Sequence, residues 1–158
     1  MERTPITQAG LDRLREELRR LEAEERPVVI KAIAEARAHG DLSENAEYHA
    51  AKERQSFIEG RIAELHAKIA TSEIIDCSRL PTDRVVFGCT VRISDQDTGE
   101  ELKLRLVGPD ESDVDNGDIS VISPLGRALI GKEPGDEFQV KTPGGVRQLE
   151  VLAIVNPE

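Results

Sequence analysis

Between two long helical patterns stands the stretch GDLSENAEY, residues 40–48. Gly40 ends the first pattern, because glycine readily adopts the positive φ at which helices commonly stop. Only a few residues separate the two patterns, so the two helices must be antiparallel neighbours. The stretch therefore predicts the exposed tip of a helical hairpin, and this tip carries two carboxylates, Asp41 and Glu44.

The first pattern predicts a helix over residues 8–39, with Thr7 as its N-cap. Its apolar residues recur three or four positions apart, with an interruption at Glu25, and this spacing is typical of a coiled-coil seam. This seam consists of Leu11, Leu14, Leu18, Leu21, Val28 and Ala32. Pro27 removes one intrahelical hydrogen bond, so we expect a bend in the helix there but not a break.

The second pattern predicts a helix from about residue 43 to residue 74. Its seam consists of Ala51, Gln55, Ile58, Ile62, Leu65 and Ile69. Alanines crowd the half of the hairpin near the tip, and small side chains let helix axes approach closely. We therefore expect a slim protrusion that could reach into a narrow space.

The pattern changes near Asp76, and short β-type runs follow. Strands are predicted at 85–87, 89–94, 101–107, 118–122, 136–142 and 146–154. A short helix is predicted within residues 123–131, with Ser123 as N-cap, Pro124 as first residue and Gly131 as stop. The sequence thus predicts an α+β fold with three parts: an antiparallel coiled-coil hairpin (1–76), a linker (77–83) and a small, mostly antiparallel sheet with one helix (84–158).

Composition limits the classes of partner. The 158 residues carry a net charge of −10, and only 3% are aromatic. Residues 1–76 hold 12 Lys and Arg against 16 Asp and Glu, and residues 77–158 hold 9 against 15. Duplex binding depends on clustered positive charge, so independent binding to duplex DNA is not expected. The spacing of Cys77 and Cys89 matches no zinc or redox motif, and no apolar run approaches membrane-spanning length. We therefore expect a soluble cytoplasmic protein with no membrane association.

The two tip carboxylates have two interpretations. Two metal ions can promote hydrolysis of a phosphodiester by activating water and neutralising charge on the phosphate. Mg²⁺ prefers carboxylate and water oxygens as ligands. Asp41 and Glu44 could help to hold such an ion. The spacing Asp-x-x-Glu is also that of a capping box, in which both acids would serve the next helix. In a third arrangement, Ser43 caps the helix and leaves both carboxylates exposed.

Two segments, AIAEARAHGDLSENAEYHAAKE (residues 32–53) and SPLGRALIGK (residues 123–132), resemble the Gre family of bacterial transcript cleavage factors. The resemblance extends over essentially the whole chain. It implies a coiled-coil N-terminal domain and a C-terminal domain similar to the FK506-binding-protein (FKBP) fold. It also implies a transcription elongation factor that inserts its tip into the secondary channel of bacterial RNA polymerase.

In that family, the tip acids help the polymerase to cleave backtracked nascent RNA, which rescues arrested complexes. The resemblance assigns this role to Asp41 and Glu44, which would share Mg²⁺ with the polymerase only in the complex. No tightly bound cofactor is expected. The chain would activate its partner without being an enzyme itself, and it would act as a monomer. The net charge of −4 over residues 1–76 favours the less basic type of family member.

The resemblance also suggests further contacts. Arg37 and Lys52 would contact the 3′ segment of the nascent RNA, although both could instead be solvated surface charges. His39 and His49 are expected to be structural or surface residues, because their spacing does not suit a metal. Tyr48 could pack at the tip or contact RNA.

Two other functions are alternatives. The first is an inhibitor of the same family that blocks the channel without cleavage; the retained acids argue against it. The second is a prolyl isomerase, whose pocket would be apolar and lined by aromatic residues. The C-terminal domain has only Phe87 and Phe138 as aromatic residues. We therefore interpret it as a polymerase-docking module, with Ser123 and Pro124 at the contact.

Overall fold

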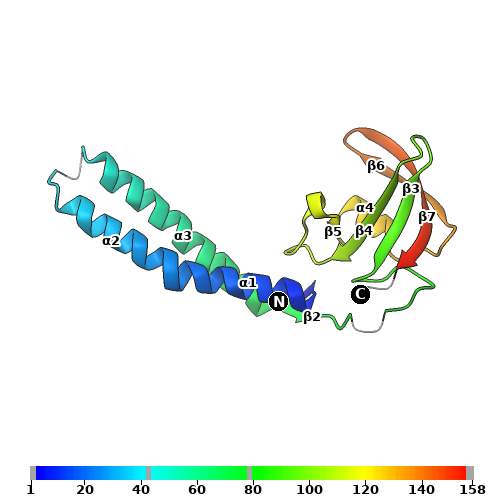
Figure 1. Ribbon diagram of the computed structural model, residues 1–158, viewed down its shortest axis with the longest axis horizontal. Coiled ribbons are helices and arrows are strands. Elements are labelled where there is room, and N and C mark those ends of the chain that lie inside the picture. Colours follow the sequence, from blue (N-terminus) through cyan, green and yellow to red (C-terminus); the bar gives the residue numbers. More distant parts are fainter. Residues whose placement is uncertain (1–2, 42–43, 78–79, 156–158) are drawn as a thin grey trace. The chain divides into compact units, whose positions relative to one another are not determined.

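The computed structural model describes residues 3–41, 44–77 and 80–155. Its contacts divide the chain into two compact units. One is the hairpin unit, Leu11–Thr71, and the other is the C-terminal unit, formed by the described parts of Met1–Gly10 and Ser72–Glu158. Figure 1 shows paired helices in the first and a curled sheet in the second.

The first arm of the hairpin is a continuous helical stretch. It comprises α1 (Gln8–Arg20), a π-helical turn η1 (Leu21–Glu25) and α2 (Arg26–Arg37). The antiparallel second arm is α3 (Ala46–Thr71) (Figure 1). The Gly10 N–H donates to Thr7 Oγ1 at 3.0 Å, which confirms Thr7 as the cap of α1.

The π-helical turn changes which residues face the partner helix. In this turn the N–H of Arg26 donates to the carbonyl of Leu21, five residues back. One residue more per turn rotates the following face by about 100°, the angle between successive residues of an α-helix. Val29 and Ile33 are therefore buried, whereas Val28 is 67% exposed. The predicted seam was wrong at Val28, although the helix is unbroken at Pro27 as predicted.

The seam of α3 is confirmed at Ile58, Ile62 and Leu65, all of which are buried. Cross-helix ion pairs fix the register of the two arms. Arg61 of α3 bonds Glu17 of α1. Near the tip the residues buried between the two helices include small ones such as Ala36, which is 3% exposed. The folded-back hairpin that the sequence predicted is therefore present.

The C-terminal unit contains two sheets. Strands β1 (Thr4–Ile6) and β2 (Ser72–Ile74) form a small parallel pair that the sequence analysis did not predict. The main sheet has the strand order β5-β4-β3-β7-β6, and its pairs are antiparallel except for β4 with β5. These strands are β3 (Thr90–Asp95), β4 (Glu101–Val107), β5 (Asp118–Ser120), β6 (Glu137–Thr142) and β7 (Gly145–Val155). The predicted α+β fold class is confirmed.

The core of this unit lies between the sheet and α4 (Pro124–Leu129). It includes Val91, Ile93, Leu106, Leu149 and Val151 from the strands and Leu129 from the helix. No strand forms at 85–87. The backbone of Val85 instead bonds the loop after α4, through Lys132 O and Gly131 N–H, each at 2.8 Å. These bonds replace the sheet partners that the prediction required.

Candidate functional site at the hairpin tip

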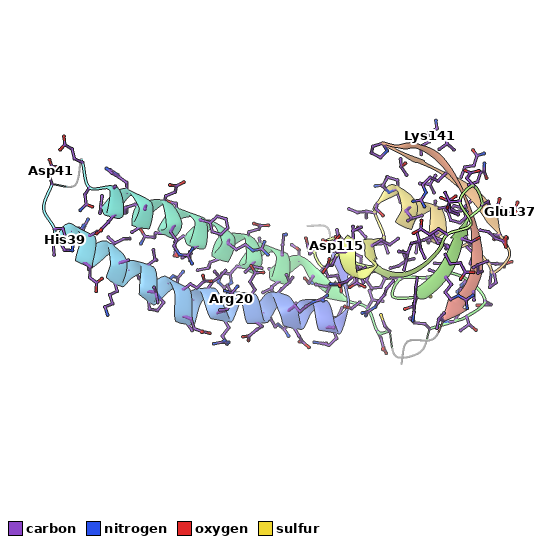
Figure 2. All side chains as sticks on the ribbon, turned by 45° about the horizontal axis from the view of Figure 1, so that its top comes forward. Arg20, His39, Asp41, Asp115, Glu137 and Lys141 are labelled. Atoms are coloured by element: carbon purple, nitrogen blue, oxygen red, sulfur yellow. The ribbon has the colours of Figure 1, made fainter. Side chains whose placement is uncertain are left out.

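The first arm ends in a short turn that presents the tip loop. After Arg37, the His39 N–H donates to Ala36 O at 3.1 Å, and Gly40 has a φ of +113°. A side chain is disfavoured at such a φ, so glycine suits this position. The next residue, Asp41, is exposed, and Figure 2 shows it on the loop that joins α2 to α3. Glu44 is also exposed.

The N-cap of α3 is Asn45. Its Oδ1 accepts from the Tyr48 N–H at 3.0 Å, and its carbonyl accepts from the His49 N–H at 3.1 Å. An Asn at this position satisfies a backbone donor that the first helical turn leaves without a partner. The capping box of Asp41 with Glu44 therefore does not describe this tip. Ser43, the other candidate cap, lies outside the described residues.

Two contacts connect the helices at the tip. The Asn45 Nδ2 donates to Ala36 O at 2.7 Å. The Arg37 guanidinium lies 5.9 Å from the centroid of the Tyr48 ring, within the range of a cation–π contact. Tyr48 therefore packs at the tip, which was one of its two expected roles, and its ring also meets that of His49 edge-on.

Lys52, which with Arg37 was predicted to contact RNA, lies on α3. Lys52 is exposed, and its Nζ donates to Gln55 Oε1 at 3.3 Å. Arg37, on the opposite arm, is exposed as well. The two cations thus flank the acidic tip from different helices. An exposed ammonium with one weak neutral partner keeps most of its capacity for phosphate.

The tip also holds a third carboxylate that the sequence analysis did not name. Glu47 lines a hollow of about 470 Å³ together with Asp41 and Glu44. The repeated three-residue spacing of these acids was the available signal. Among the described residues, no group of three or more His, Cys, Asp or Glu side chains is placed to hold a metal ion.

A second candidate surface lies in the C-terminal unit, beside α4. The Ser123 Oγ accepts from the Gly126 N–H at 3.0 Å and donates to Ser120 O at 2.6 Å, which confirms the predicted cap. Ser123 therefore shapes the loop, whereas Pro124 is exposed. A Cβ at Gly126 would overlap the Ser120 carbonyl, so glycine lets α4 lie directly on the chain after β5.

Pro124 lines an apolar groove of about 480 Å³. Its apolar walls come from α4, β5, the end of β6 with the residue after it, and the 3₁₀ turn η2 (Val114–Asn116). They include Val114, Ile119, Leu125, Val140 and Pro143. The described lining holds no aromatic side chain, so it lacks the aromatic walls expected of a prolyl isomerase pocket.

Comparison with known proteins identifies the class to which this hairpin and sheet belong. Residues 4–74 match the family model "Transcription elongation factor, N-terminal", and residues 80–156 match "Transcription elongation factor, GreA/GreB, C-term". Together the two models cover nearly the whole chain. The chain belongs to the GreA/GreB family of transcription elongation factors.

Two relatives at high sequence identity support this assignment. The chain is 58% identical to the transcription elongation factor GreA of Syntrophobacter fumaroxidans, over 99% of this chain and 100% of that protein. It is 57% identical to GreA of Caulobacter vibrioides, over 98% of each chain. A solved structure of GreA factor homolog 1 from Thermus thermophilus is 31% identical, with a TM-score of 0.46, over 98% of this chain and 99% of that one.

Within residues 3–41, 44–77 and 80–155, no helix is both long enough and apolar enough to cross a membrane.

Proposed function

We propose that this chain inserts its hairpin tip into the secondary channel of bacterial RNA polymerase and stimulates Mg²⁺-dependent cleavage of backtracked nascent RNA. One observation supports this most directly. Because Asn45 caps α3, the tip does not need Asp41 or Glu44 as caps, and both are exposed on one loop. The relatives named GreA place the chain in the matching family.

The dimensions of the hairpin suit entry into a channel. The 26 residues of α3 span roughly 39 Å at 1.5 Å per residue. Small residues near the tip keep this end slim, and the tip loop is the part of the hairpin unit that would arrive first. A carboxylate carried on such an arm could meet an active site buried inside a large partner.

The chemistry follows from the donor set. Bound Mg²⁺ would activate water and neutralise charge on the scissile phosphate. Asp41 and Glu44 would complete the coordination of an ion whose other ligands belong to the polymerase and the RNA. Mg²⁺ commonly keeps such shared ligand sets of carboxylate, phosphate and water. Arg37 and Lys52, on either side of the acids, would contact the phosphates of the displaced RNA 3′ segment.

In this proposal the chain is not itself an enzyme. Two tip carboxylates on an exposed loop offer neither a full metal site nor a substrate pocket, so catalysis requires the partner. The groove at Pro124 would dock on the polymerase and hold one copy of the chain in place. The channel-blocking alternative fits less well, because both acids are present at the tip.

The test is a halted, backtracked polymerase complex supplied with Mg²⁺ and the full chain. We expect shortened RNA with the wild type. Asp41→Asn and Glu44→Gln each remove one carboxylate from an exposed loop and should lower the cleavage rate by roughly tenfold or more. The matched control is Glu53→Gln, which removes an exposed acid of α3 and should cleave like the wild type.

The outcomes separate the two functions. Acid variants that cleave as fast as the wild type would contradict the proposed role of the tip. A wild-type chain that slows transcription without shortening the RNA would favour the channel-blocking inhibitor.

A further inference from the structure

The tip contains one polar side chain that bonds to both helices. Asn45 is half-buried at the start of α3. Its Oδ1 accepts from the Tyr48 N–H of α3 at 3.0 Å. Its Nδ2 donates across the hairpin to the carbonyl oxygen of Ala36 in α2, at 2.7 Å. The side chain therefore does more than a helix cap requires.

The cross-helix bond closes the loop that carries the two acids. The chain leaves α2 after Arg37 and enters α3 at Ala46, so the bond from Asn45 to Ala36 joins residues at the two ends of this loop. Ala36 O also accepts from the His39 N–H at 3.1 Å, which fixes the first turn of the loop. Asn45 lines the same hollow as Asp41 and Glu44. Asn45 thus contacts both ends of the acidic loop.

Only an amide of this length performs both tasks. Asn offers an oxygen acceptor and an N–H donor on one planar group. Ser would cap the helix equally well but cannot reach across to donate to Ala36 O. Asp would also cap, and its charge would suit the helix N-terminus, but its second oxygen would face a carbonyl oxygen. Ser and Asp substitutions therefore separate capping from cross-helix bonding.

We infer that Asn45 is a positioning residue, whose cross-helix bond to Ala36 holds the tip loop so that Asp41 and Glu44 meet the shared metal together. The inference rests on the proposed function of the tip. Positioning errors of about 1 Å can cost up to roughly 100-fold in rate, so a loosened loop should slow cleavage without weakening polymerase binding.

The experiment measures RNA cleavage in a backtracked complex while the concentrations of factor and Mg²⁺ are varied separately. Asn45→Ser and Asn45→Asp should each lower the cleavage rate at saturating factor by roughly tenfold. The factor concentration for half-maximal cleavage should not change, and the Mg²⁺ concentration for half-maximal cleavage should rise. A residue that only caps α3 would move none of these quantities, because both variants keep a good cap.

The matched control is Gln96→Ser. It removes an exposed side-chain amide in the turn after β3, where the Gln96 Nε2 donates to Glu137 Oε1 at 2.8 Å. This variant should cleave like the wild type. Far-UV circular dichroism of both Asn45 variants would check that their helical content equals that of the wild type.

Two results would overturn the inference. The first is a wild-type cleavage rate at saturating factor for both Asn45 variants, while Asp41→Asn is inactive. The second is a higher half-maximal factor concentration with an unchanged maximal rate, which would make Asn45 a docking residue. If Asp41→Asn and Glu44→Gln cleave like the wild type, the proposed function itself fails, which is a separate result.

Discussion

Arg61 of α3 and Glu17 of α1 form a bidentate ion pair across the hairpin. Arg61 Nε and Nη2 each lie 2.8 Å from one oxygen of the Glu17 carboxylate. Both side chains are about two-thirds buried or more, with exposed fractions of 27% and 31%. Paired geometry of this kind fixes the register of the two helices as well as stabilising them.

The first prediction is that acid weakens this cross-helix bond. Hydrogen bonds from Arg61 lower the pKa of Glu17 below its ordinary value of 4.5, and partial burial opposes this shift. Glu17 therefore contributes its full stabilisation above pH 4.5 and loses it as the pH falls through the lower folded-state pKa. Glu17→Gln should cost roughly 0.5 to 1 kcal/mol at neutral pH.

The measurement is thermal unfolding, followed by circular dichroism, of wild type and Glu17→Gln across the acid range. The difference in stability between the two proteins should shrink as the pH falls below 4.5. A difference that stays constant across this range would contradict the assignment. Glu53→Gln, at an exposed site, serves as the control.

The second prediction concerns the face of α2 after the π-helical turn. Val29 is 2% exposed and Val28 is 67% exposed. Val29→Ala removes two buried methyl groups and should destabilise the hairpin by about 2 kcal/mol, whereas Val28→Ala should change stability by less than about 0.5 kcal/mol. Urea unfolding of the two variants compares neighbouring positions directly. A larger loss of stability in Val28→Ala than in Val29→Ala would instead support the seam that the sequence predicted.

That seam illustrates what the sequence could predict. Local signals were sufficient for the cap at Thr7, the α3 seam and the start of α4 at Pro124. Each depends on residues within one or two turns of the chain. The π-helical turn is different. It leaves the spacing of the apolar residues before it unchanged, and it changes only which of the later residues face the partner helix. Val28 and Val29 are equally apolar, so composition could not choose between them.

At the tip, several neighbouring residues have side chains that could cap α3, so their chemistry did not identify the cap. Asp41, Ser43 and Asn45 are all good N-caps, and they lie within five residues of one another. The sequence placed both acids at the tip but could not say which residue caps α3. The bond from Asn45 to Ala36 needs the two helices already packed, so no local signal could have predicted it.

The third prediction concerns a buried carboxylate in the C-terminal unit. Glu111 is 7% exposed, and it accepts from the Thr7 N–H at 2.7 Å and from the Gly108 N–H at 3.1 Å. It also accepts from the Thr7 hydroxyl, 104 residues away in the chain. Glu111→Ala should cost about 2 to 4 kcal/mol, because buried donors left without a partner cost roughly 1 kcal/mol or more each.

Hydrogen exchange gives the sharpest readout for this variant. The amide protons of Thr7 and Gly108 should lose protection in Glu111→Ala, while those of the central strands keep theirs. Glu133→Ala, at an exposed acid of the same unit, should leave both stability and exchange unchanged. Full protection at Thr7 in the Glu111 variant would show that other groups hold this helix start.

The fourth prediction tests the docking groove. Pro124→Asp places a charge at the exposed first residue of α4, where an acid favours the helix and the fold should persist. The charge lies in an apolar groove, so docking on the polymerase should weaken. The half-maximal factor concentration for RNA cleavage should rise about tenfold, equivalent to roughly 1.4 kcal/mol. The maximal rate should not change, and a lower maximal rate would place Pro124 in the cleavage step.

The fifth prediction concerns the cations that flank the tip. Lys52→Glu reverses a charge on α3 without disturbing a cross-helix contact, whereas Arg37→Glu would also remove the contact with Tyr48. Lys52 is therefore the cleaner test of RNA contact. Crosslinking between the hairpin and the RNA 3′ segment should fall about fivefold in Lys52→Glu, which corresponds to roughly 1 kcal/mol.

The matched variant is Lys31→Glu, which makes the same charge reversal on α2 at a side chain that is 79% exposed. Since Lys31 lies about two turns before the end of α2, it should not contribute to crosslinking at the tip. The dependence of crosslinking on salt should also weaken in Lys52→Glu, because one phosphate contact fewer releases fewer counterions. Unchanged crosslinking in Lys52→Glu would make Lys52 a solvated surface charge and would leave Arg37 as the candidate RNA contact.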